Sequence, residues 1–176
     1  TGEDGSGMHE MKPIAGLHAA VLLPGSKIYS QRALVVAALA EGESRLQNVL
    51  VAEDTRYLMA ALGLLGAEIS GTGSEVMVRG TGGKIRNPGQ DIFLGNNGTA
   101  LRLLTSLVCL GKGPFVLTGV NRLCERPVQP LLDALAKMGI SARSKAGNGC
   151  PPVVIAADGI PGGRITLVNI ASSQYV

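Results

Sequence analysis

The chain has 176 residues, of which 45% are apolar, and a formal net charge of +3. Its length and apolar content allow a sizeable core, in one domain or in two small ones. Three tyrosines, two phenylalanines and no tryptophan leave little material for stacking on bases, and the scattered basic residues form no stripe, so we expect no nucleic-acid partner.

The longest apolar run, residues 33–40, is far too short to cross a bilayer, and no signal peptide is visible. We therefore expect no membrane association and a cytoplasmic location. Cys109, Cys124 and Cys150 form neither an even disulfide set nor a close-spaced metal pattern, so no metal site is predicted.

A first unit of alternating elements is predicted over about residues 18–80, after residues 1–7, which look like a linker or tag remnant. A helix predicted at 30–41 ends at Gly42, because glycine is common just after helix C-termini. The whole predicted order is a strand at 18–23, the helix at 30–41, a strand at 44–49, a helix at 54–65, and two short strands at 67–70 and 75–79.

A second unit of the same β-α-β-α-β-β order is predicted over about residues 90–157. Pro127 is predicted to be the first residue of its second helix, where the missing N–H has no cost. The other elements are a strand at 91–94, a loop at 95–99, a helix at 100–110, a strand at 115–118, and a hairpin of 140–143 with 153–156.

A third unit, residues 163–176, is predicted to open with a strand at 164–168 and to stop where its first helix should begin. A repeat without its helix cannot cover its sheet face. We therefore expect the sequence to be a piece of a longer protein.

The two longer units correspond to one another along the sequence. Arg32 and Arg102 stand 70 positions apart, each in a helix that follows a loop of small residues. A second helical pattern, closed by glycine, recurs after 73 positions. Its residues are Leu58, Ala61, Leu62, Leu65 and Gly66 in the first copy and Leu131, Ala134, Leu135, Met138 and Gly139 in the second.

The loops that precede the two arginine-bearing helices are candidate anion sites. Unpaired N–H groups and the helix dipole at a helix start favour an anion. Lys27, Arg32 and Arg102 would add full positive charge there, and arginine matches the planar geometry of phosphate and carboxylate. From these residues alone, the alternative that the glycines serve turns and the arginines lie on solvated helix faces stays open.

Several segments together resemble the 5-enolpyruvylshikimate-3-phosphate synthase family, also called the 3-phosphoshikimate 1-carboxyvinyltransferases. They occur in family order from about residue 12 to the end of the chain. They are LPGSK at 23–27, SQRAL at 30–34, LGNNGTALR at 94–102, ERP at 125–127, CPP at 150–152 and SSQY at 172–175.

The resemblance implies an α+β fold of repeated βαβαββ units, the inside-out α/β barrel of the enolpyruvyl transferases. In this family two domains enclose the substrates, and residues 8–176 would form an incomplete N-terminal domain. The implied reaction transfers the carboxyvinyl group of phosphoenolpyruvate to the 5-hydroxyl of shikimate 3-phosphate and releases phosphate. It belongs to the shikimate pathway, which leads to chorismate and the aromatic amino acids, it is the target of glyphosate, and it needs no cofactor.

By the same resemblance, five residues are expected to bind shikimate 3-phosphate. Lys27 matches a lysine that touches both substrates, and Arg32 matches an arginine that binds the shikimate carboxylate. Ser172 and Ser173 match serines on the 3-phosphate, and Gln174 is expected to reach towards both ligands.

The phosphoenolpyruvate contacts are expected at Gly98, by close backbone approach, and at Arg126, by charge. Asn96, Thr99 and Arg102 are further candidates, and for Arg102 structural support is weighed equally with binding. The residues that act as acid and base in the family belong to the C-terminal domain. We therefore expect no turnover from this chain alone and a need for that domain, in cis or as a complementary chain.

Four positions depart from the family pattern. Ile28 replaces a serine, Asn97 replaces an alanine and is expected to crowd the phosphoenolpyruvate site, Leu103 replaces a proline, and Cys124 replaces a basic residue. A divergent enzyme, altered glyphosate sensitivity and lost activity all remain open. Two other functions also remain as alternatives: a UDP-N-acetylglucosamine carboxyvinyltransferase, and a non-catalytic half of a split enzyme.

Overall fold

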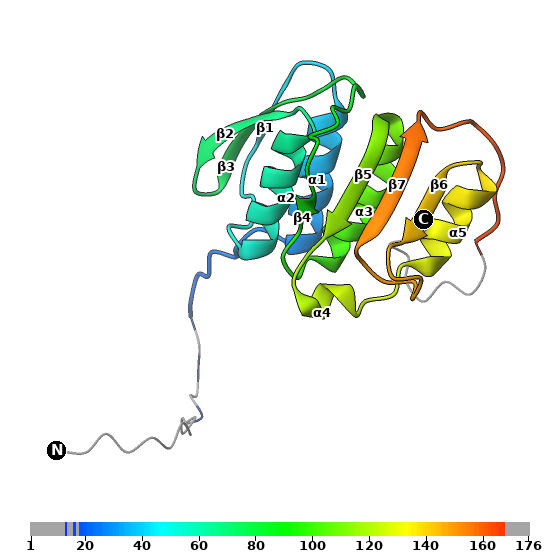
Figure 1. The fold of residues 1–176 in the computed structure, drawn as a ribbon. Coiled ribbons are helices and arrows are strands. Elements are labelled where there is room, and N and C mark those ends of the chain that lie inside the picture. Colours follow the sequence, from blue (N-terminus) through cyan, green and yellow to red (C-terminus); the bar gives the residue numbers. More distant parts are fainter. Residues whose placement is uncertain (1–12, 14–15, 17, 168–176) are drawn as a thin grey trace.

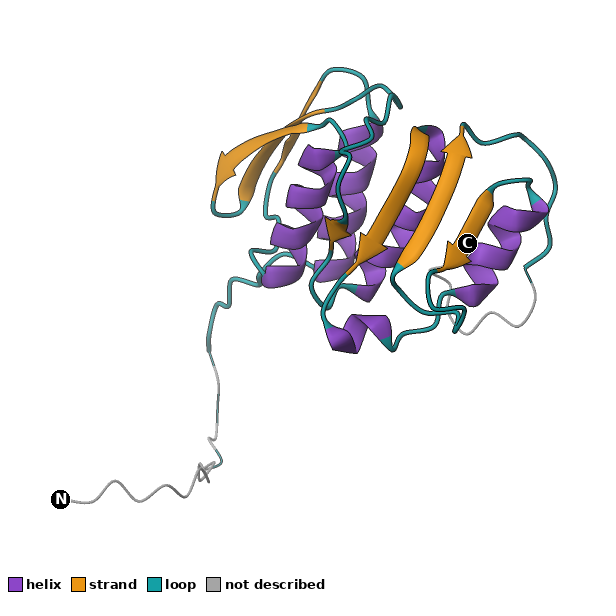
Figure 2. Cartoon of the chain, in the orientation of Figure 1, coloured by secondary structure: helices purple, strands orange, loops and turns teal. Residues whose placement is uncertain are grey.

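The computed structural model of the chain describes residues 13, 16 and 18–167. The predicted linker at residues 1–7 lies outside the described residues, and so does the chain from residue 168 onward. The predictions for Ser172, Ser173 and Gln174 therefore fall outside the described residues. Within them, the fold is mixed α and β, as predicted, with two units that each carry strands along one side of their helices (Figures 1 and 2).

The first unit is a three-stranded antiparallel sheet with two helices. Its elements are α1 (Lys27–Leu39), β1 (Glu43–Leu46), α2 (Glu53–Leu64), β2 (Glu68–Thr72) and β3 (Glu75–Arg79). β3 is the central strand and pairs Val78 with Ser44 of β1 and with Ile69 of β2. α1 contacts β1 and β3, whereas α2 contacts β2.

The second unit has a four-stranded mixed sheet. Its elements are β4 (Ile92–Phe93), α3 (Gly98–Leu107), the 3-10 turn η1 (Val108–Leu110), β5 (Lys112–Thr118), α4 (Asn121–Cys124), α5 (Gln129–Lys137), β6 (Ser141–Ser144) and β7 (Val153–Asp158). The strand order is β4-β5-β7-β6, with β4 parallel to β5 and the other pairs antiparallel. β1, β3 and β2 of the first unit thus correspond to β5, β7 and β6.

The predicted duplication also holds at the ends of the helices. α2 and α5 both end in a Schellman motif, in which a residue with left-handed backbone follows the helix and the next N–H bonds back to the helix. Gly66 (φ +115°) and Gly139 (φ +81°) are the left-handed residues. The closing hydrogen bonds run from Ala67 N to Leu62 O and from Ile140 N to Leu135 O.

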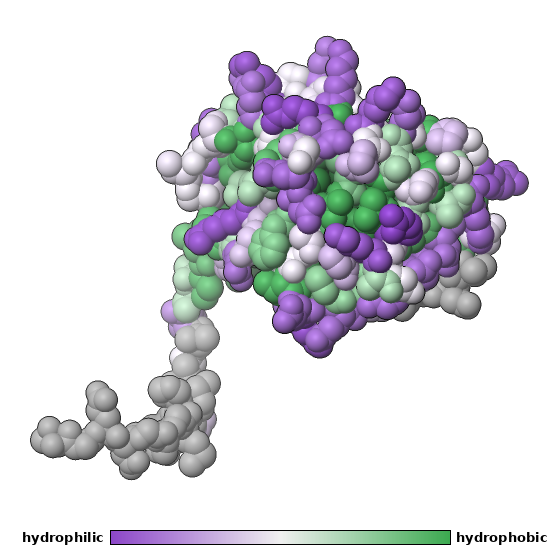
Figure 3. Space-filling model, viewed as in Figure 1, coloured by the Kyte–Doolittle hydropathy of each residue, from purple (hydrophilic) through white to green (hydrophobic). Residues whose placement is uncertain are grey.

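The strand predicted at residues 18–23 is wrong, because residues 18–26 form neither helix nor strand. Val21 and Leu22 are 77% and 98% exposed, and this segment is the green part of the stalk in Figure 3. An apolar run is a local pattern, whereas a strand also needs a hydrogen-bonded neighbour, and no described strand pairs with this segment. The open edge of β1 lies where the second unit has β4.

Three further predictions of element boundaries are wrong. The helix predicted at 30–41 begins earlier, at Lys27, because the Ser26 hydroxyl caps α1 by accepting from the Tyr29 N–H, and α1 ends at Leu39. Pro127 does not begin a helix: the short α4 and its closing turn come directly before it, and Pro130 lies in the first turn of α5 instead. Residues 164–167 form no strand, since they too have no strand neighbour among the described residues.

One hydrophobic core runs through both units. α1 contacts α2 within its own unit and α3 of the other unit. Leu34, Leu58 and Leu104, one from each of these helices, are fully buried. No described helix has the length and apolar character needed to span a membrane.

Cys109 belongs to this core and packs as an ordinary apolar side chain. It lies fully buried in η1, where its thiol donates to the Thr105 carbonyl at 3.2 Å. Burial raises the pKa of the Cys109 thiol from 9.0 to about 11, against a smaller lowering by a backbone hydrogen bond. The thiol therefore stays protonated at neutral pH.

We predict that iodoacetamide at pH 8 modifies Cys124 and Cys150 of the folded chain well before Cys109. The reason is that thiolate is the nucleophile and Cys109 is both buried and protonated. Mass spectrometry of the digested chain measures this order.

Folding stability should also fall as the pH rises from about 9 to about 11, since only the unfolded chain ionises the Cys109 thiol in that range. A Cys109→Ala variant should lack that part of the pH dependence. Alkylation of Cys109 at the rate of Cys124 would contradict the burial and protonation of the Cys109 thiol.

Gln31 is the one polar residue whose place in the core has no compensating contact among the described residues. It lies fully buried on α1, and neither its amide nitrogen nor its amide oxygen has a hydrogen-bond partner there. The residue 70 positions later, Leu101 of α3, is equally buried. The second unit thus fills the same helical position with an apolar side chain.

We predict that Gln31→Leu stabilises the chain by about 1 kcal/mol, because it removes a buried amide that has lost its water contacts without replacement. Urea unfolding measures the change. Leu101→Gln is the mirror variant and should destabilise. A loss of stability in Gln31→Leu would contradict this prediction.

Candidate functional site

The predicted anion sites lie at the starts of α1 and α3, and the structure connects both to the start of α2. Lys27, the first residue of α1, forms an ion pair with the carboxylate of Asp54, the second residue of α2. The Lys27 side chain is 54% exposed and that of Asp54 only 17%. The ammonium group is therefore held in place and still reachable from solvent.

Asn97 joins α3 to the same residue of α2. Its side-chain oxygen accepts from the Ala100 N–H at 2.9 Å, which caps α3, and its amide nitrogen donates to the Asp54 carbonyl at 2.8 Å. Lys27, Asp54 and Asn97, which we call the Asp54 junction, thus tie the starts of three helices together. The sequence reasoning expected Asn97 to crowd a ligand, but the side chain is 1% exposed and fills the contact between α2 and α3.

Two arginines lie over the first turn of α3, beside the Asp54 junction. The point where a Cβ would stand on Gly98 is 2.8 Å from Nη1 of Arg126 and 3.3 Å from Nη1 of Arg102. Arg102 also donates to the Gly98 carbonyl at 3.0 Å. Both guanidinium groups therefore pack on the backbone of Gly98, in space that any other residue would occupy.

We call Lys27, Arg102 and Arg126 the cation cluster, since a chain of contacts through Asp54, Asn97 and Gly98 links them. Within these contacts Asp54 supplies the only carboxylate. No ion pair or side-chain hydrogen bond holds the Arg126 guanidinium within residues 18–167, whereas the neighbouring Arg122 pairs with Glu125 at 2.8 Å. The cluster can therefore receive a ligand with more than one negative charge.

Side-chain charge, and not free backbone groups, makes this a candidate anion site. The N–H of Gly98 donates to the Asn96 carbonyl and that of Ala100 to Asn97, so neither is open to a ligand. At α1, the Ser26 hydroxyl oxygen accepts a hydrogen bond from the Tyr29 N–H. The expectation of unpaired N–H groups at these loops is thus wrong for these three, and the helix dipole and the three cations remain.

The other predicted residues are Arg32, Asn96 and Thr99, and no hydrogen bond or ion pair among the described residues links Arg32 or Asn96 to the side chains of the cation cluster. Arg32 is half-buried on α1 and donates to the Ile28 carbonyl at 3.5 Å, the same bond to the fourth preceding residue that Arg102 makes on α3. Five positions separate it from Lys27, which places it about 140° around the helix axis. Asn96 is exposed and Thr99 is half-buried.

Asp54 is the site residue that the sequence reasoning missed. The visible pattern was the pair of acidic residues, Glu53 and Asp54, that begins α2, where the helix dipole favours negative charge. That pattern explains a stable helix start, but it does not reveal that Lys27 and Asn97 bond to the same residue. Three other positions depart from the family pattern. Ile28 is exposed, Leu103 is half-buried, and the half-buried Cys124 has its thiol 3.6 Å from the Gly119 carbonyl.

Comparison with known proteins supports the resemblance. The family model of EPSP synthase (3-phosphoshikimate 1-carboxyvinyltransferase) matches residues 11–176. The chain belongs to the EPSP synthase family. Because the matching names are those of the shikimate enzyme, the UDP-N-acetylglucosamine alternative is not favoured.

Individual relatives agree with this assignment. The chain is 44% identical over 169 residues to the 3-phosphoshikimate 1-carboxyvinyltransferase of Sulfurovum sp. (strain NBC37-1), a match that covers 94% of the chain and 40% of that protein. It is 42% identical over 160 residues to that of Methanothermobacter thermautotrophicus, covering 91% of the chain and 38% of that protein. The solved EPSP synthase from Acinetobacter baumannii has a TM-score of 0.81 at 30% identity, over 88% of this chain and 36% of that one. The chain thus spans about 40% of the length of its curated relatives.

The two hydrogen bonds of Asn97 generate a testable prediction. We expect Asn97→Ala to destabilise the chain by about 2 kcal/mol, because it removes a helix cap and the buried side-chain hydrogen bond that joins α3 to the Asp54 carbonyl. Urea unfolding measures the loss. Ser26→Ala, which removes an exposed cap with a 3.5 Å bond, is the matched control and should cost less. Equal losses in the two variants would show that the bond to α2 contributes nothing.

Proposed function

We propose that the whole protein to which this chain belongs transfers the carboxyvinyl group of phosphoenolpyruvate to the 5-hydroxyl of shikimate 3-phosphate, with release of phosphate. We further propose that the cation cluster is this chain's share of the site. The observation that carries the proposal is the packing of Arg102 and Arg126 on Gly98, next to the solvent-accessible Lys27, in a chain of this family.

The chemistry of the cluster suits these substrates. Phosphoenolpyruvate carries a planar carboxylate and a phosphate with three terminal oxygens. Guanidinium groups bind either of these acceptors with paired hydrogen bonds. Arg126 would bind such a group with its open guanidinium, while the absence of a side chain at Gly98 lets the ligand approach the α3 backbone. Lys27 would act as a movable point charge between the two substrates, since it can exchange Asp54 for a ligand anion.

The remaining predicted contacts are part of the same proposal. Arg32 would bind the shikimate carboxylate, Ser172 and Ser173 the 3-phosphate, and Gln174 both ligands. Asn96 and Thr99 would border the phosphoenolpyruvate site. The chain would supply two units and the start of a third of an N-terminal domain, and the acid and base groups would come from the rest of the protein, in cis or as a complementary chain. We expect a cytoplasmic location, because three unpaired cysteines are typical of a reducing compartment.

We predict that shikimate 3-phosphate and phosphoenolpyruvate stabilise the purified chain, whereas a UDP-sugar does not. A ligand at ten times its dissociation constant contributes about 1.4 kcal/mol, which raises the Tm of a chain of this size by about 3 °C. Thermal unfolding at millimolar ligand measures the shift. Phosphate release from both substrates should be undetectable until a C-terminal half from a relative is co-expressed.

Variants separate specific binding from general charge. Arg126→Gln should remove the shift caused by phosphoenolpyruvate, whereas Arg122→Gln, four residues earlier and already paired with Glu125, should leave it unchanged. Gly98→Ala should weaken phosphoenolpyruvate binding about tenfold, since its methyl group displaces both guanidinium groups. Stabilisation by neither substrate, or equal effects of the two arginine variants, would contradict the proposal.

A further inference from the structure

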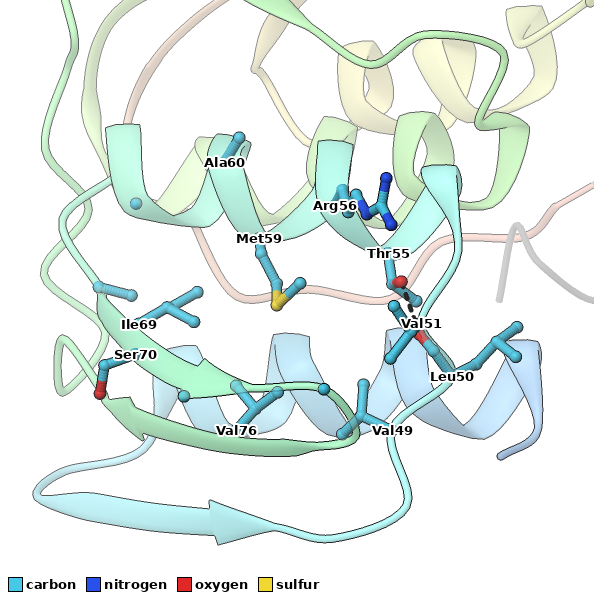
Figure 4. A pocket seen from close by; sticks show the side chains of 14 residues that line it. Val49, Leu50, Val51, Thr55, Arg56, Met59, Ala60, Ile69, Ser70 and Val76 are labelled. Carbon is cyan, nitrogen blue, oxygen red and sulfur yellow. Dashed lines mark hydrogen bonds between the residues drawn. The ribbon is translucent and has the colours of Figure 1, made fainter. Parts of the chain in front are cut away.

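A pocket of about 550 Å³ lies between α2 and the β2–β3 hairpin, and none of its lining residues belongs to the cation cluster. Figure 4 shows Met59 of α2 pointing down into it, with Ile69, Val76 and Val49 facing it from the hairpin and the preceding loop. This volume is within the range of small-molecule sites, about 300 to 1,000 Å³. The pocket is thus large enough for a ligand and has apolar walls.

The pocket contains one cation at its rim. Arg56 is exposed on α2, where Figure 4 shows its side chain along the helix above Thr55, and no acidic side chain lines the pocket. Within residues 18–167, no ion pair or side-chain hydrogen bond engages its guanidinium group. Other described arginines do have such contacts, with carboxylates at Arg45, Arg79 and Arg122 and with backbone carbonyls at Arg86, whereas Arg126, Arg143 and Arg164 have none within the described part of the chain.

The second unit lacks this arrangement, which shows that the repeat itself does not require it. Seventy-three positions on, Arg56 and Ala60 correspond to Gln129 and Asp133 of α5. Those two side chains bond to each other at 2.6 Å and so satisfy one another. In the first unit Ala60 stands where the second unit has Asp133. Arg56 therefore has no carboxylate four residues along its own helix to accept its hydrogen bonds.

We propose that this pocket binds a small amphipathic anion, with a single carboxylate or sulfonate at Arg56 and an apolar body between α2 and the hairpin. Met59 would contact the apolar body, because its flexible thioether adapts to ligands of different shape. The anionic head would remain at the rim, where Arg56 is exposed and the head keeps part of its hydration. This site is separate from the proposed substrate site.

Gly63 supplies a variant that tests the pocket without disturbing the fold. It lines the pocket from the last turn of α2, and a Cβ added there meets nothing within 4 Å. Gly63→Leu should therefore fill the pocket, and since glycine is a poor helix former the variant should fold. Gly63→Ala is the matched control, with the same gain in helix propensity and little loss of volume.

The experiment is a titration of the 176-residue chain, carrying 13C-labelled methionine methyl groups, with octanoate and with the neutral octanol. We expect octanoate to shift the Met59 signal, assigned by its loss in Met59→Leu, and to leave Met138 of the second unit unchanged. Octanol should bind more weakly. Arg56→Gln should weaken octanoate binding about fivefold, the effect of one exposed ion pair, with no effect on octanol. Gly63→Leu should abolish the shift, and Gly63→Ala should keep it.

Three results would overturn the proposal. One is a Met138 shift with the same midpoint as that of Met59, which would show general association with apolar surface. Another is octanoate binding that Arg56→Gln or Gly63→Leu leaves unchanged. The third is displacement of octanoate by shikimate 3-phosphate, which would place the probe in the cation cluster. The last outcome would leave the proposed substrate site intact, so the two proposals fail separately.

Discussion

The Asp54 junction is the contact on which the rest of the site depends. One residue of α2 receives the Lys27 ammonium on its carboxylate and the Asn97 amide on its carbonyl, so the starts of α1, α2 and α3 share one point. Asp54 is itself fixed by its neighbour. The buried Thr55 hydroxyl donates to the Leu50 carbonyl at 2.6 Å and accepts from the Ala52 N–H, which closes the loop before α2. A shift of that loop would move all three helix starts.

The two bonds to Asp54 differ in how easily they open. The bond from Asn97 is buried, and breaking it would leave polar groups without water, so it holds the framework. The ion pair with Lys27 is half-exposed, and such pairs contribute little to stability because water and salt screen them. An incoming anion can therefore take the ammonium group from Asp54 at small cost while α1 and α3 keep their places. This division suits the proposed site, which would have to be both preorganised and open to a ligand.

Features that depend on local sequence were predicted correctly, whereas features that depend on a distant partner were not. The helical spacing that ends in Gly66 and Gly139 predicted both helices and their C-terminal ends, and the alternation at 75–79 predicted β3. The run at 18–23 has the same local character, but its strand needs a neighbour that the described residues do not provide. For the candidate site, Gly98, Lys27, Arg102 and Arg126 were predicted from the sequence, and the structure links them through Asp54 and Asn97. The sequence could not show that Asn97 bonds to Asp54, a residue 43 positions away. It also could not show that the Asn97 side chain accepts the Ala100 N–H, which would otherwise have been open to a ligand.

The duplicated unit also explains why the site is asymmetric. Lys27 and Asn97 stand 70 positions apart, at equivalent places in the two copies, and both bond to Asp54. The first copy exposes the charged Lys27 to solvent, whereas the second copy buries the Asn97 amide, which caps α3. The same divergence recurs elsewhere, with buried Gln31 against Leu101 and open Arg56 against the satisfied Gln129. Because the backbone of a repeat is already stabilised by its core, single positions can exchange structural for ligand-binding roles without changing the fold.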